Sequence, residues 1–367
     1  MTKAHIVGWG HSPFGKLPEP NTETLMQGVI QEALLHAGVT HEAIDGIFVG
    51  VYNNGFSAQD FQAALVAMGD ERFAHTPATR YENACATGSA ALHGALDFIE
   101  SGRGRIALVV GAEKMTATPT ADVGNILLSA SYHQEEAHIA GGFAGVFGEI
   151  ATSYFQKYGD RSYELAMIAA KNHANGVANP WAQMRKDIGT DFCATISERN
   201  PTVAGPLRRT DCSLISDGAA ALVIADAETA AQLERAIAFR ARTQANDLMA
   251  LSRRDVLAFR GASIACFTIA ELLEYEAMGL AAPGEGYRVI REGITHKDGA
   301  LPVNPSGGLK SKGHPIGATG VSMHVMAAMQ LMEEAGDMQI PNAHIAGVFN
   351  MGGAAVTNYV SILERMK

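Results

Sequence analysis

One residue with the chemistry of a nucleophile lies in a run of small neighbours. Cys85 belongs to the run Asn83-Ala84-Cys85-Ala86-Thr87-Gly88, where an expected strand is followed by an expected helix. Unpaired backbone N–H groups and the macrodipole at a helix N-terminus favour an anion, which lowers the pKa of a thiol. The small side chains leave space for a bulky substrate. Cys85 is therefore a candidate nucleophile; the alternative is a small buried core residue, as cysteines often are.

A candidate base lies more than two hundred residues further on, in a segment rich in glycine. The segment reads Asn304-Pro305-Ser306-Gly307-Gly308-Leu309-Lys310-Ser311-Lys312-Gly313-His314-Pro315-Ile316-Gly317. His314 stands between Gly313 and Pro315, directly before a second expected helix. An imidazole beside a thiol can accept its proton and so activate it. A single histidine is more often structural, but its position relative to the repeat described next favours a catalytic pair with Cys85.

An internal repeat explains how these two residues would meet. Ala86-Thr87-Gly88 opens one helix and Ala318-Thr319-Gly320 opens another, and each helix leads to a short apolar strand, at residues 106–111 and 344–347. A strand at residues 5–8 has a counterpart at 237–239 with a similar offset. Two similar α/β halves are the natural inference, covering residues 1–235 and 236–367. If the halves pack about a pseudo-twofold axis, the two helix N-termini converge and bring Cys85 to His314.

Further elements complete the expected first half. An amphipathic helix over residues 22–38 and buried strands at 47–51 and 219–224 indicate layered α/β architecture. Residues from about 115 to 206 differ, because they combine helical stretches at 146–158 and 163–172 with no convincing central strand. We expect them to form an insertion that covers the sheet.

Composition excludes several classes of protein. The chain has 367 residues, of which 47% are apolar and 18% charged, a balance that argues against disorder. Its net charge of −10 argues against nucleic acid or an anionic membrane as the main partner. Four cysteines without a C-x-x-C pair make a zinc site or a disulfide framework improbable. With no apolar segment of membrane-spanning length and no signal peptide, the sequence predicts a cytoplasmic protein without a metal.

One alternative class is suggested by a short glycine motif. Gly8-Trp9-Gly10 follows the first expected strand, as the phosphate-binding loop of an NAD-dependent dehydrogenase does. Pro13 stands where the third glycine of that loop belongs, however, and no phosphate-binding helix follows at once. The dehydrogenase reading is therefore the weakest of those considered.

The chain resembles the thiolase family of acyl-CoA acyltransferases over nearly its whole length. The resemblance is carried by the runs around Cys85 and His314, by Asp211-Cys212-Ser213, and by Asn350-Met351-Gly352-Gly353-Ala354. Cys266-Phe267-Thr268-Ile269-Ala270-Glu271-Leu272 is similar to the sterol-carrier-protein-x type branch in particular. The resemblance implies a thiolase-like α/β fold, with two similar halves in five layers (αβαβα) and an inserted loop domain.

The resemblance also implies roles for individual residues. Cys85 would take the acyl group from CoA as a thioester, His314 would activate it, and the backbone N–H groups of Cys85 and Gly352 would form an oxyanion hole. Many thiolases have a second catalytic cysteine where this chain has Asn350, so Cys266 would serve as the second acid/base. The residues expected to contact substrate are Ser306, Gly307, Gly308, Lys310, Lys312 and Asn350, with the two lysines attracting CoA phosphates. As an alternative, these lysines are simply exposed loop residues.

Acyl-CoA and CoA are then substrates, and no further cofactor is expected. Resemblance implies a homodimer or tetramer, and some relatives in this branch act with a small OB-fold partner protein. The reaction implied is thiolysis of a 3-oxoacyl-CoA, or the reverse Claisen condensation, through S-acyl Cys85. The alternative is a thiolase-like protein that binds acyl-CoA or lipid, or a complex subunit with reduced or partner-dependent activity.

Two departures from the family support that alternative. The branch normally has His-Asp before the cysteine, whereas this chain has Ile264-Ala265 before Cys266. The second half is also short: only about 30 residues separate Ile237 from Cys266, against about 45 between Ile6 and Val51, too few for a helix and a strand at ~1.5 and ~3.3 Å per residue. Either the second half lacks part of an element, or a segment of the natural chain is absent.

Overall fold

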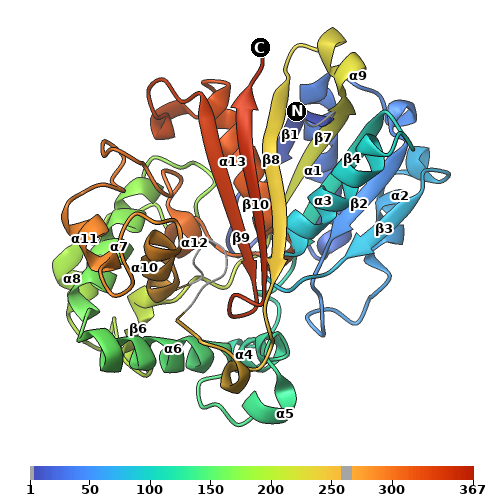
Figure 1. Ribbon diagram of the computed structural model, residues 1–367. Helices are drawn as coiled ribbons and strands as arrows, with labels where there is room; N and C mark the ends of the chain where they lie inside the picture. Colours follow the sequence, from blue (N-terminus) through green and yellow to red (C-terminus); the bar gives the residue numbers. More distant parts are fainter. Residues whose placement is uncertain (1–3, 258–266) are drawn as a thin grey trace.

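The computed structural model describes residues 4–257 and 267–367, which are built around one mixed sheet (Figure 1). Eight strands follow the order β3-β2-β4-β7-β1-β8-β10-β9, and β5 and β6 form a separate two-stranded sheet. The strands are β1 (Ala4–His11), β2 (Gly46–Gly50), β3 (Ala78–Tyr81), β4 (Ile106–Glu113), β5 (Thr202–Ala204), β6 (Leu207–Arg208), β7 (Gly218–Asp226), β8 (Ile237–Asn246), β9 (Ile345–Gly352) and β10 (Thr357–Arg365).

Thirteen α-helices are present among the described residues. They are α1 (Thr22–Ala37), α2 (Leu65–Gly69), α3 (Thr87–Glu100), α4 (Thr120–Leu128), α5 (His133–Glu136), α6 (Phe143–Tyr158), α7 (Ser162–Gly176), α8 (Thr190–Ala194), α9 (Ala227–Gln232), α10 (Thr268–Ala277), α11 (Gly286–Arg291), α12 (Gly308–Ser311) and α13 (Ile316–Leu331). No helix in the described part of the chain is long and apolar enough to span a membrane.

The first half forms the layer on which the site is built. β2 runs parallel to β3 and β4, while β7 runs antiparallel to both β4 and β1. All eight residues of β4 are buried, as its apolar run predicts for a strand covered on both faces. Because β2 and β4 are parallel, the residues that follow them emerge at the same edge of the sheet, where the candidate site lies.

Helix α1 covers the outer face of this layer. The Asn21 side chain caps its first turn by accepting the Thr24 N–H, and Gly38 ends it with a φ of 69°. Gly8 and Gly10 lie in β1 beneath it: a Cβ at Gly8 would come within 2.5 Å of Ala37 Cβ, and one at Gly10 within 2.2 Å of a backbone oxygen of α1. The glycines of the Gly8-Trp9-Gly10 motif therefore allow close helix–strand packing and form no dinucleotide-binding loop.

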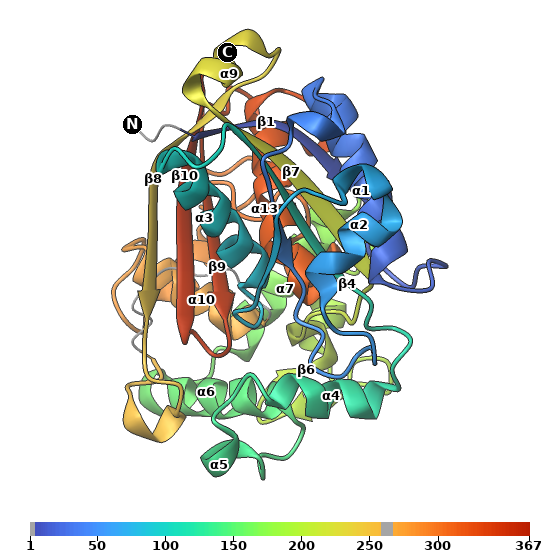
Figure 2. The same ribbon diagram turned by 90° about the vertical axis from the view of Figure 1, so that its right-hand side faces the viewer.

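Helices α3 and α13 pack together in the centre of the molecule (Figure 2). They touch through glycines, since a Cβ at Gly88 of α3 would lie 2.7 Å from the Val321 nitrogen and 2.8 Å from the Gly317 oxygen of α13. Their apolar faces form one core with both parts of the sheet, including Leu92, Val109 and Leu363. The convergence of two helix N-termini expected from the repeat is present.

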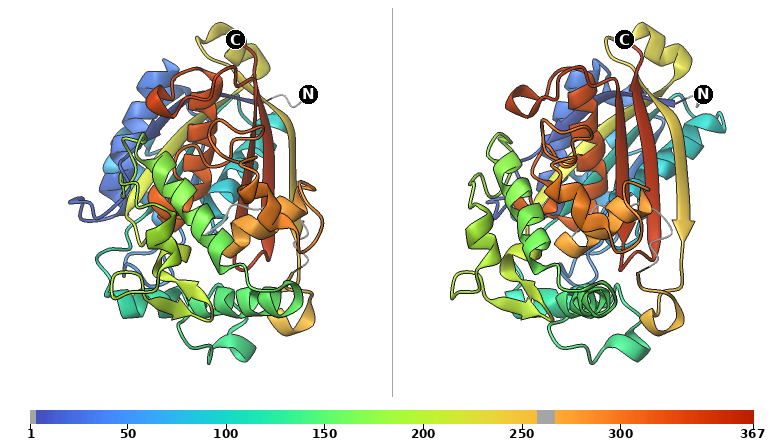
Figure 3. Two further views of the ribbon diagram at one scale, coloured as in Figure 1. Left: turned by 90° about the vertical axis from the view of Figure 1, so that its left-hand side faces the viewer. Right: turned by 60° about the vertical axis from the view of Figure 1, so that its left-hand side comes forward.

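The second half repeats only part of the first. β8, α13, β9 and β10 correspond in order to β1, α3, β4 and β7, and the strand order β9-β10-β8 matches β4-β7-β1. No counterpart of α1, β2 or β3 occurs between β8 and α13 among the described residues. In the described part of the chain, no helix covers the outer face of β8, β10 and β9, where a fifth layer is expected (Figure 3). The shortness seen in the sequence thus corresponds to a sheet face that the described residues leave open.

The insertion packs at the end of the sheet where β2 and β4 finish (Figure 2). Helices α4 to α8 belong to it, and β5 lies outside the main sheet, as expected from the lack of a central strand. Its apolar residues share a core with α10 and α11 of the second half, including Phe147, Ile269 and Val289. Cys85 belongs to the same cluster, so the insertion and the second half pack directly around it. The boundary between the halves at residue 235 stays a prediction.

Candidate active site

Cys85 lies in a strained turn immediately before α3. Ala84 has a φ of 49°, in the left-handed region that a residue with a Cβ rarely adopts. The turn is closed by hydrogen bonds from the Ala86 nitrogen to the Asn83 oxygen (2.9 Å) and from the Thr87 nitrogen to the Ala84 oxygen (3.1 Å). Because α3 begins at Thr87, Cys85 stands at the positive end of that helix.

Two hydrogen bonds hold His314 at the start of α13. Its backbone N–H donates to Ser216 Oγ at 2.9 Å, and its ring Nδ1 lies 2.7 Å from Thr319 Oγ1. The Thr319 hydroxyl donates its own proton to the Pro315 oxygen at 2.9 Å. A hydroxyl has one proton to give, so Nδ1–H must be the donor to Thr319 and Nε2 is the basic nitrogen of the neutral ring.

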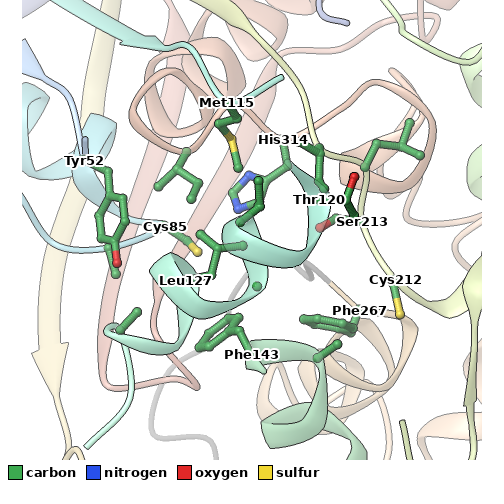
Figure 4. Close-up of a pocket in the computed structure, with 18 of the residues that line it drawn as sticks. Tyr52, Cys85, Met115, Thr120, Leu127, Phe143, Cys212, Ser213, Phe267 and His314 are labelled. Atoms are coloured by element: carbon green, nitrogen blue, oxygen red, sulfur yellow. The ribbon is translucent and has the colours of Figure 1, made fainter. Parts of the chain in front are cut away.

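Cys85 and His314 line the same pocket, at the junction of the two halves and the insertion (Figure 4). The cavity has a volume of about 230 Å³. Its other lining residues are mostly apolar, namely Tyr52, Ala84, Met115, Thr120, Val123, Gly124, Leu127, Ala130, Gly141, Phe143, Ala144, Val203, Cys212, Ser213, Leu214, Ile215, Phe267 and Ile316. The Cys–His pairing expected from the repeat is therefore placed in one cavity.

A buried carboxyl group joins the halves behind this pocket. Glu113, at the end of β4 and 1% exposed, accepts backbone N–H groups of Tyr52, Asn53 and Gly317, each at 3.0 Å. Gly317 belongs to the first turn of α13, so the carboxyl group caps the helix that carries His314. Burial raises the pKa of Glu113 to about 7, against the opposing effect of the three N–H donors.

Asn350 and Gly352 hold the Cys85 turn from the strand β9. The Asn350 side chain donates to the Cys85 oxygen at 3.0 Å and accepts from Ser89 Oγ at 2.8 Å. Gly352 lies so close to the turn that a Cβ there would be 2.2 Å from the Asn83 oxygen. Neither residue lines the pocket. Asn350 thus contacts the backbone of Cys85 rather than the pocket.

The glycine-rich segment before His314 faces away from the pocket. The Ser306 oxygen accepts from Asn179 Nδ2 at 2.8 Å, and Gly307 packs on Gly176 of α7, 2.7 Å from an added Cβ. Ser306, Gly307 and Gly308 are all absent from the pocket lining. These residues shape the turn that presents His314, and no contact places them at a substrate.

The two lysines of this segment are buried, which corrects the expectation that they attract CoA phosphates. Lys310 is 3% exposed, and its Nζ donates to the Cys212 oxygen. Lys312 is 2% exposed; its Nζ donates to Ser322 Oγ at 2.7 Å, and burial lowers its pKa to about 7. Neither ammonium group faces solvent, because α7 and the core close over the segment. The alternative of exposed loop lysines is equally wrong.

Cys266 lies outside the described residues, so its role stays a prediction, whereas Phe267 beside it lines the pocket. The sequence reasoning overlooked Tyr52 and Glu113. Each stands at or directly after the carboxyl end of a buried parallel strand, β2 or β4. That position, where parallel strands deliver side chains to one edge, is the signal that could have found them.

The comparisons with known proteins show the family. Residues 4–228 match the model of the thiolase N-terminal domain, and residues 218–365 match the thiolase C-terminal domain-like model. Together these models cover almost the whole described chain. The protein belongs to the thiolase family, and the thiolase-like α/β fold expected from the sequence is confirmed.

The chain has relatives among the acetyl-CoA acetyltransferases and among the sterol carrier proteins. The chain is 33% identical to an acetyl-CoA acetyltransferase of Methanothermobacter thermautotrophicus over the full length of both proteins. It is 29% identical to sterol carrier protein 2 of Bos taurus, covering 96% of this chain and 71% of that protein. Among solved structures, the Ltp2-ChsH2(DUF35) aldolase has a TM-score of 0.78 at 19% identity, covering 99% of this chain and 98% of that one.

Proposed function

We propose that the protein is a thiolase-type acyltransferase that forms an S-acyl intermediate on Cys85. It would catalyse thiolysis of a 3-oxoacyl-CoA or the reverse condensation of two acyl-CoAs. The observation that carries this proposal is the placement of Cys85 and His314 in one largely apolar pocket, each at the start of a helix. Family membership and the acetyl-CoA acetyltransferase relatives support the same reaction class.

In the first stage of thiolysis, His314 Nε2 accepts the Cys85 proton and the sulfur attacks the 3-oxo carbon. The bond between C2 and C3 then breaks, and its electron pair leaves on C2 of acetyl-CoA, which takes up a proton. The N–H group of Cys85, which lines the pocket, would stabilise the oxyanion; Gly352, the second donor implied by the resemblance, is not among the lining residues. In the second stage the CoA sulfur attacks the thioester, releasing acyl-CoA and returning the proton to Cys85.

Peptide mass spectrometry tests the first stage. Brief incubation with acyl-CoA thioesters of several chain lengths is expected to add one acyl mass to the peptide with Cys85, and Cys85→Ala is expected to abolish it. Cys193→Ala is the matched control, because that thiol is fully buried and outside the pocket. A folded wild-type protein that carries no label with any thioester would contradict the proposal.

By resemblance to the sterol-carrier-protein-x branch, we propose that Cys266 is the acid/base that exchanges the proton at C2 of the substrate. Cys266→Ala is then expected to leave acylation of Cys85 largely intact and to slow condensation by about 10²–10⁴-fold, the range for a general acid or base. The two steps are measured separately, by mass spectrometry and by product formation from acetyl-CoA. Equal loss of both steps in this variant would refute the assignment.

A second candidate function is that of a subunit whose activity depends on a partner protein. The open outer face of β8, β10 and β9 favours it, since Ile345 there is 53% exposed. The name of the structurally similar Ltp2-ChsH2(DUF35) aldolase joins two components, and by analogy we propose a partner protein for this chain. Cys85 acylation that appears only when a co-purified small protein is added would favour this function over independent activity.

We propose that two copies of the chain associate through β3, the edge strand at the end of the sheet away from β9. β3 is the terminal strand, so one side of its backbone has no strand partner among the described residues, and Phe61 nearby is 77% exposed. A second copy could continue the sheet there and form a homodimer. Light scattering coupled to size-exclusion chromatography is expected to give twice the chain mass for wild type and a smaller mass for Ala78→Pro. The N–H of Ala78 faces the free edge, because the Pro77 oxygen before it accepts from Ile47 of β2 in this parallel pair.

A further inference from the structure

The pocket walls are mostly apolar. Val123 and Leu127 come from α4 and Phe143 comes from α6, while Met115 and Ile316 pack in one apolar cluster. The volume is about 230 Å³. A cavity of about 150 Å³ accepts a six-carbon ring, so this pocket has space for roughly nine non-hydrogen atoms. An acetyl group has only three and would leave most of it unfilled.

Contacts between buried aromatic rings fix the shape of these walls. Phe143 meets Phe147 edge-on with ring centroids 5.6 Å apart, and Phe147 stacks on Phe267 at 4.2 Å. All three rings are at least nine-tenths buried. Tyr52 anchors the end of α4, because its hydroxyl lies 2.7 Å from Ser129 Oγ and 3.2 Å from the Ile126 oxygen. The apolar volume is therefore preformed on rigid elements.

One residue leaves a gap in the wall formed by α4. Thr120, Val123, Gly124 and Leu127 line the pocket at spacings of three, four and seven residues, which places them on one helix face. Gly124 has no side chain there, and a Cβ built on it would meet no atom within 4 Å. Its backbone is not in the left-handed region, so its conformation does not require glycine. What glycine supplies at this position is space.

We infer that the pocket accepts an apolar acyl group of medium size, roughly six to nine carbon atoms, and that Gly124 sets its capacity. This inference rests on the proposed acyl transfer at Cys85. Each methylene buried in an apolar site contributes about fourfold to binding, so a pocket of this kind favours the longer thioester unless steric contact excludes it. Filling the space above Gly124 supplies that contact.

The test is the ratio of kcat/KM for thiolysis of 3-oxooctanoyl-CoA to that of acetoacetyl-CoA. For wild type, kcat/KM is expected to be about tenfold or more higher for 3-oxooctanoyl-CoA than for acetoacetyl-CoA, which is the effect of burying two or more methylenes. Gly124→Leu is expected to lower this ratio at least tenfold, and Gly124→Ala by a smaller factor. Gly28→Leu is the matched control, since Gly28 also lies in a helix with no atom within 4 Å of an added Cβ but is outside the pocket.

The outcomes separate this inference from the function on which it rests. A wild type that favours acetoacetyl-CoA, or a ratio that Gly124→Leu leaves unchanged, would overturn the inference while acylation of Cys85 by acetyl groups would still support acyl transfer. Absence of Cys85 acylation by any thioester would instead contradict the proposed function. Circular dichroism of both Gly124 variants checks that the helix is retained, and the Ala variant keeps the test decisive if Leu prevents folding.

Discussion

At the scale of single residues, Glu113 connects the candidate active site to the stability of the protein. Burial raises its pKa from 4.5 to about 7, so between these values the folded protein retains a proton that the unfolded chain has released. Its contribution to the free energy of unfolding is therefore complete below pH 4.5 and is lost as the pH rises through 7. At ~1.4 kcal/mol per pKa unit, that change amounts to about 3 kcal/mol.

Glu113→Gln is expected to remove this pH dependence. The amide replaces one carboxyl oxygen with a donor, so at least one of the three N–H groups loses its acceptor, at a cost of about 1–3 kcal/mol. Urea unfolding at pH 5, 6, 7 and 8 measures both effects. Glu198→Gln, on an exposed loop, serves as the control. Parallel pH dependences for wild type and Glu113→Gln would show that this carboxyl is not the titrating group.

Lys312 gives the free energy of unfolding the opposite dependence on pH. Burial lowers its pKa from 10.5 to about 7, so between these values the folded protein has lost a proton that the unfolded chain keeps. The free energy of unfolding therefore rises with pH over this range. Around its Nζ lie Ser322, the Phe14 ring at 5.6 Å and the neutral His11 ring, whose pKa burial lowers to about 3.

Lys312→Met is expected to flatten that rise and to stabilise the protein at pH 7 by on the order of 2 kcal/mol, since an unfavourably buried amine is replaced by an apolar chain of similar length. Ser322 keeps His11 Nε2 as a partner at 2.7 Å, so the substitution leaves its hydroxyl bonded. Thermal unfolding at pH 7 and pH 9.5 is the measurement. Destabilisation at both pH values would mean that the ammonium group has a favourable partner.

At the scale of elements, the site depends on how closely α3 and α13 approach. Gly88→Ala would place a Cβ 2.7–3.0 Å from three backbone atoms of α13, which cannot move independently. We expect a loss of about 1–3 kcal/mol in stability and slower Cys85 acylation, because separating the helices separates Cys85 from His314. Gly28→Ala, with open space around its Cβ, is expected to be neutral or stabilising. Unimpaired acylation in Gly88→Ala would refute the coupling.

The elements also show what a sequence can and cannot predict. The helices beginning at Thr87 and Ile316 were predictable because repeated motifs mark both N-termini, and the pairing of Cys85 with His314 followed from them. The position of Lys310 was not predictable, because its burial depends on α7 packing over a segment that is distant in the chain. Glu113 was overlooked for a similar reason: its three partners lie on segments that only the tertiary fold brings together.

At the scale of the whole molecule, the two halves are covered unequally. α1 buries the outer face of the first half, whereas the corresponding face of β8, β10 and β9 has no described helix on it. Gly347, Phe349, Val360 and Ile362 share this face, since a Cβ at Gly347 would contact both Phe349 and Ile362. Each of these residues is at least partly exposed. An apolar sheet face of this kind marks an interaction surface or a liability to aggregate.

Ile345→Lys tests whether that face is open in the isolated protein. On an open face the substitution is expected to change stability by less than about 0.5 kcal/mol and to reduce binding of a hydrophobic dye and self-association at high salt. Val348→Ala is the contrast, because Val348 points to the other face, is 2% exposed and packs in the core, so its loss is expected to cost about 1–3 kcal/mol. Urea unfolding and light scattering measure these effects. If Ile345→Lys instead unfolds the protein as readily as Val348→Ala, another segment of the chain packs on the face, and the partner-dependent function loses its main support.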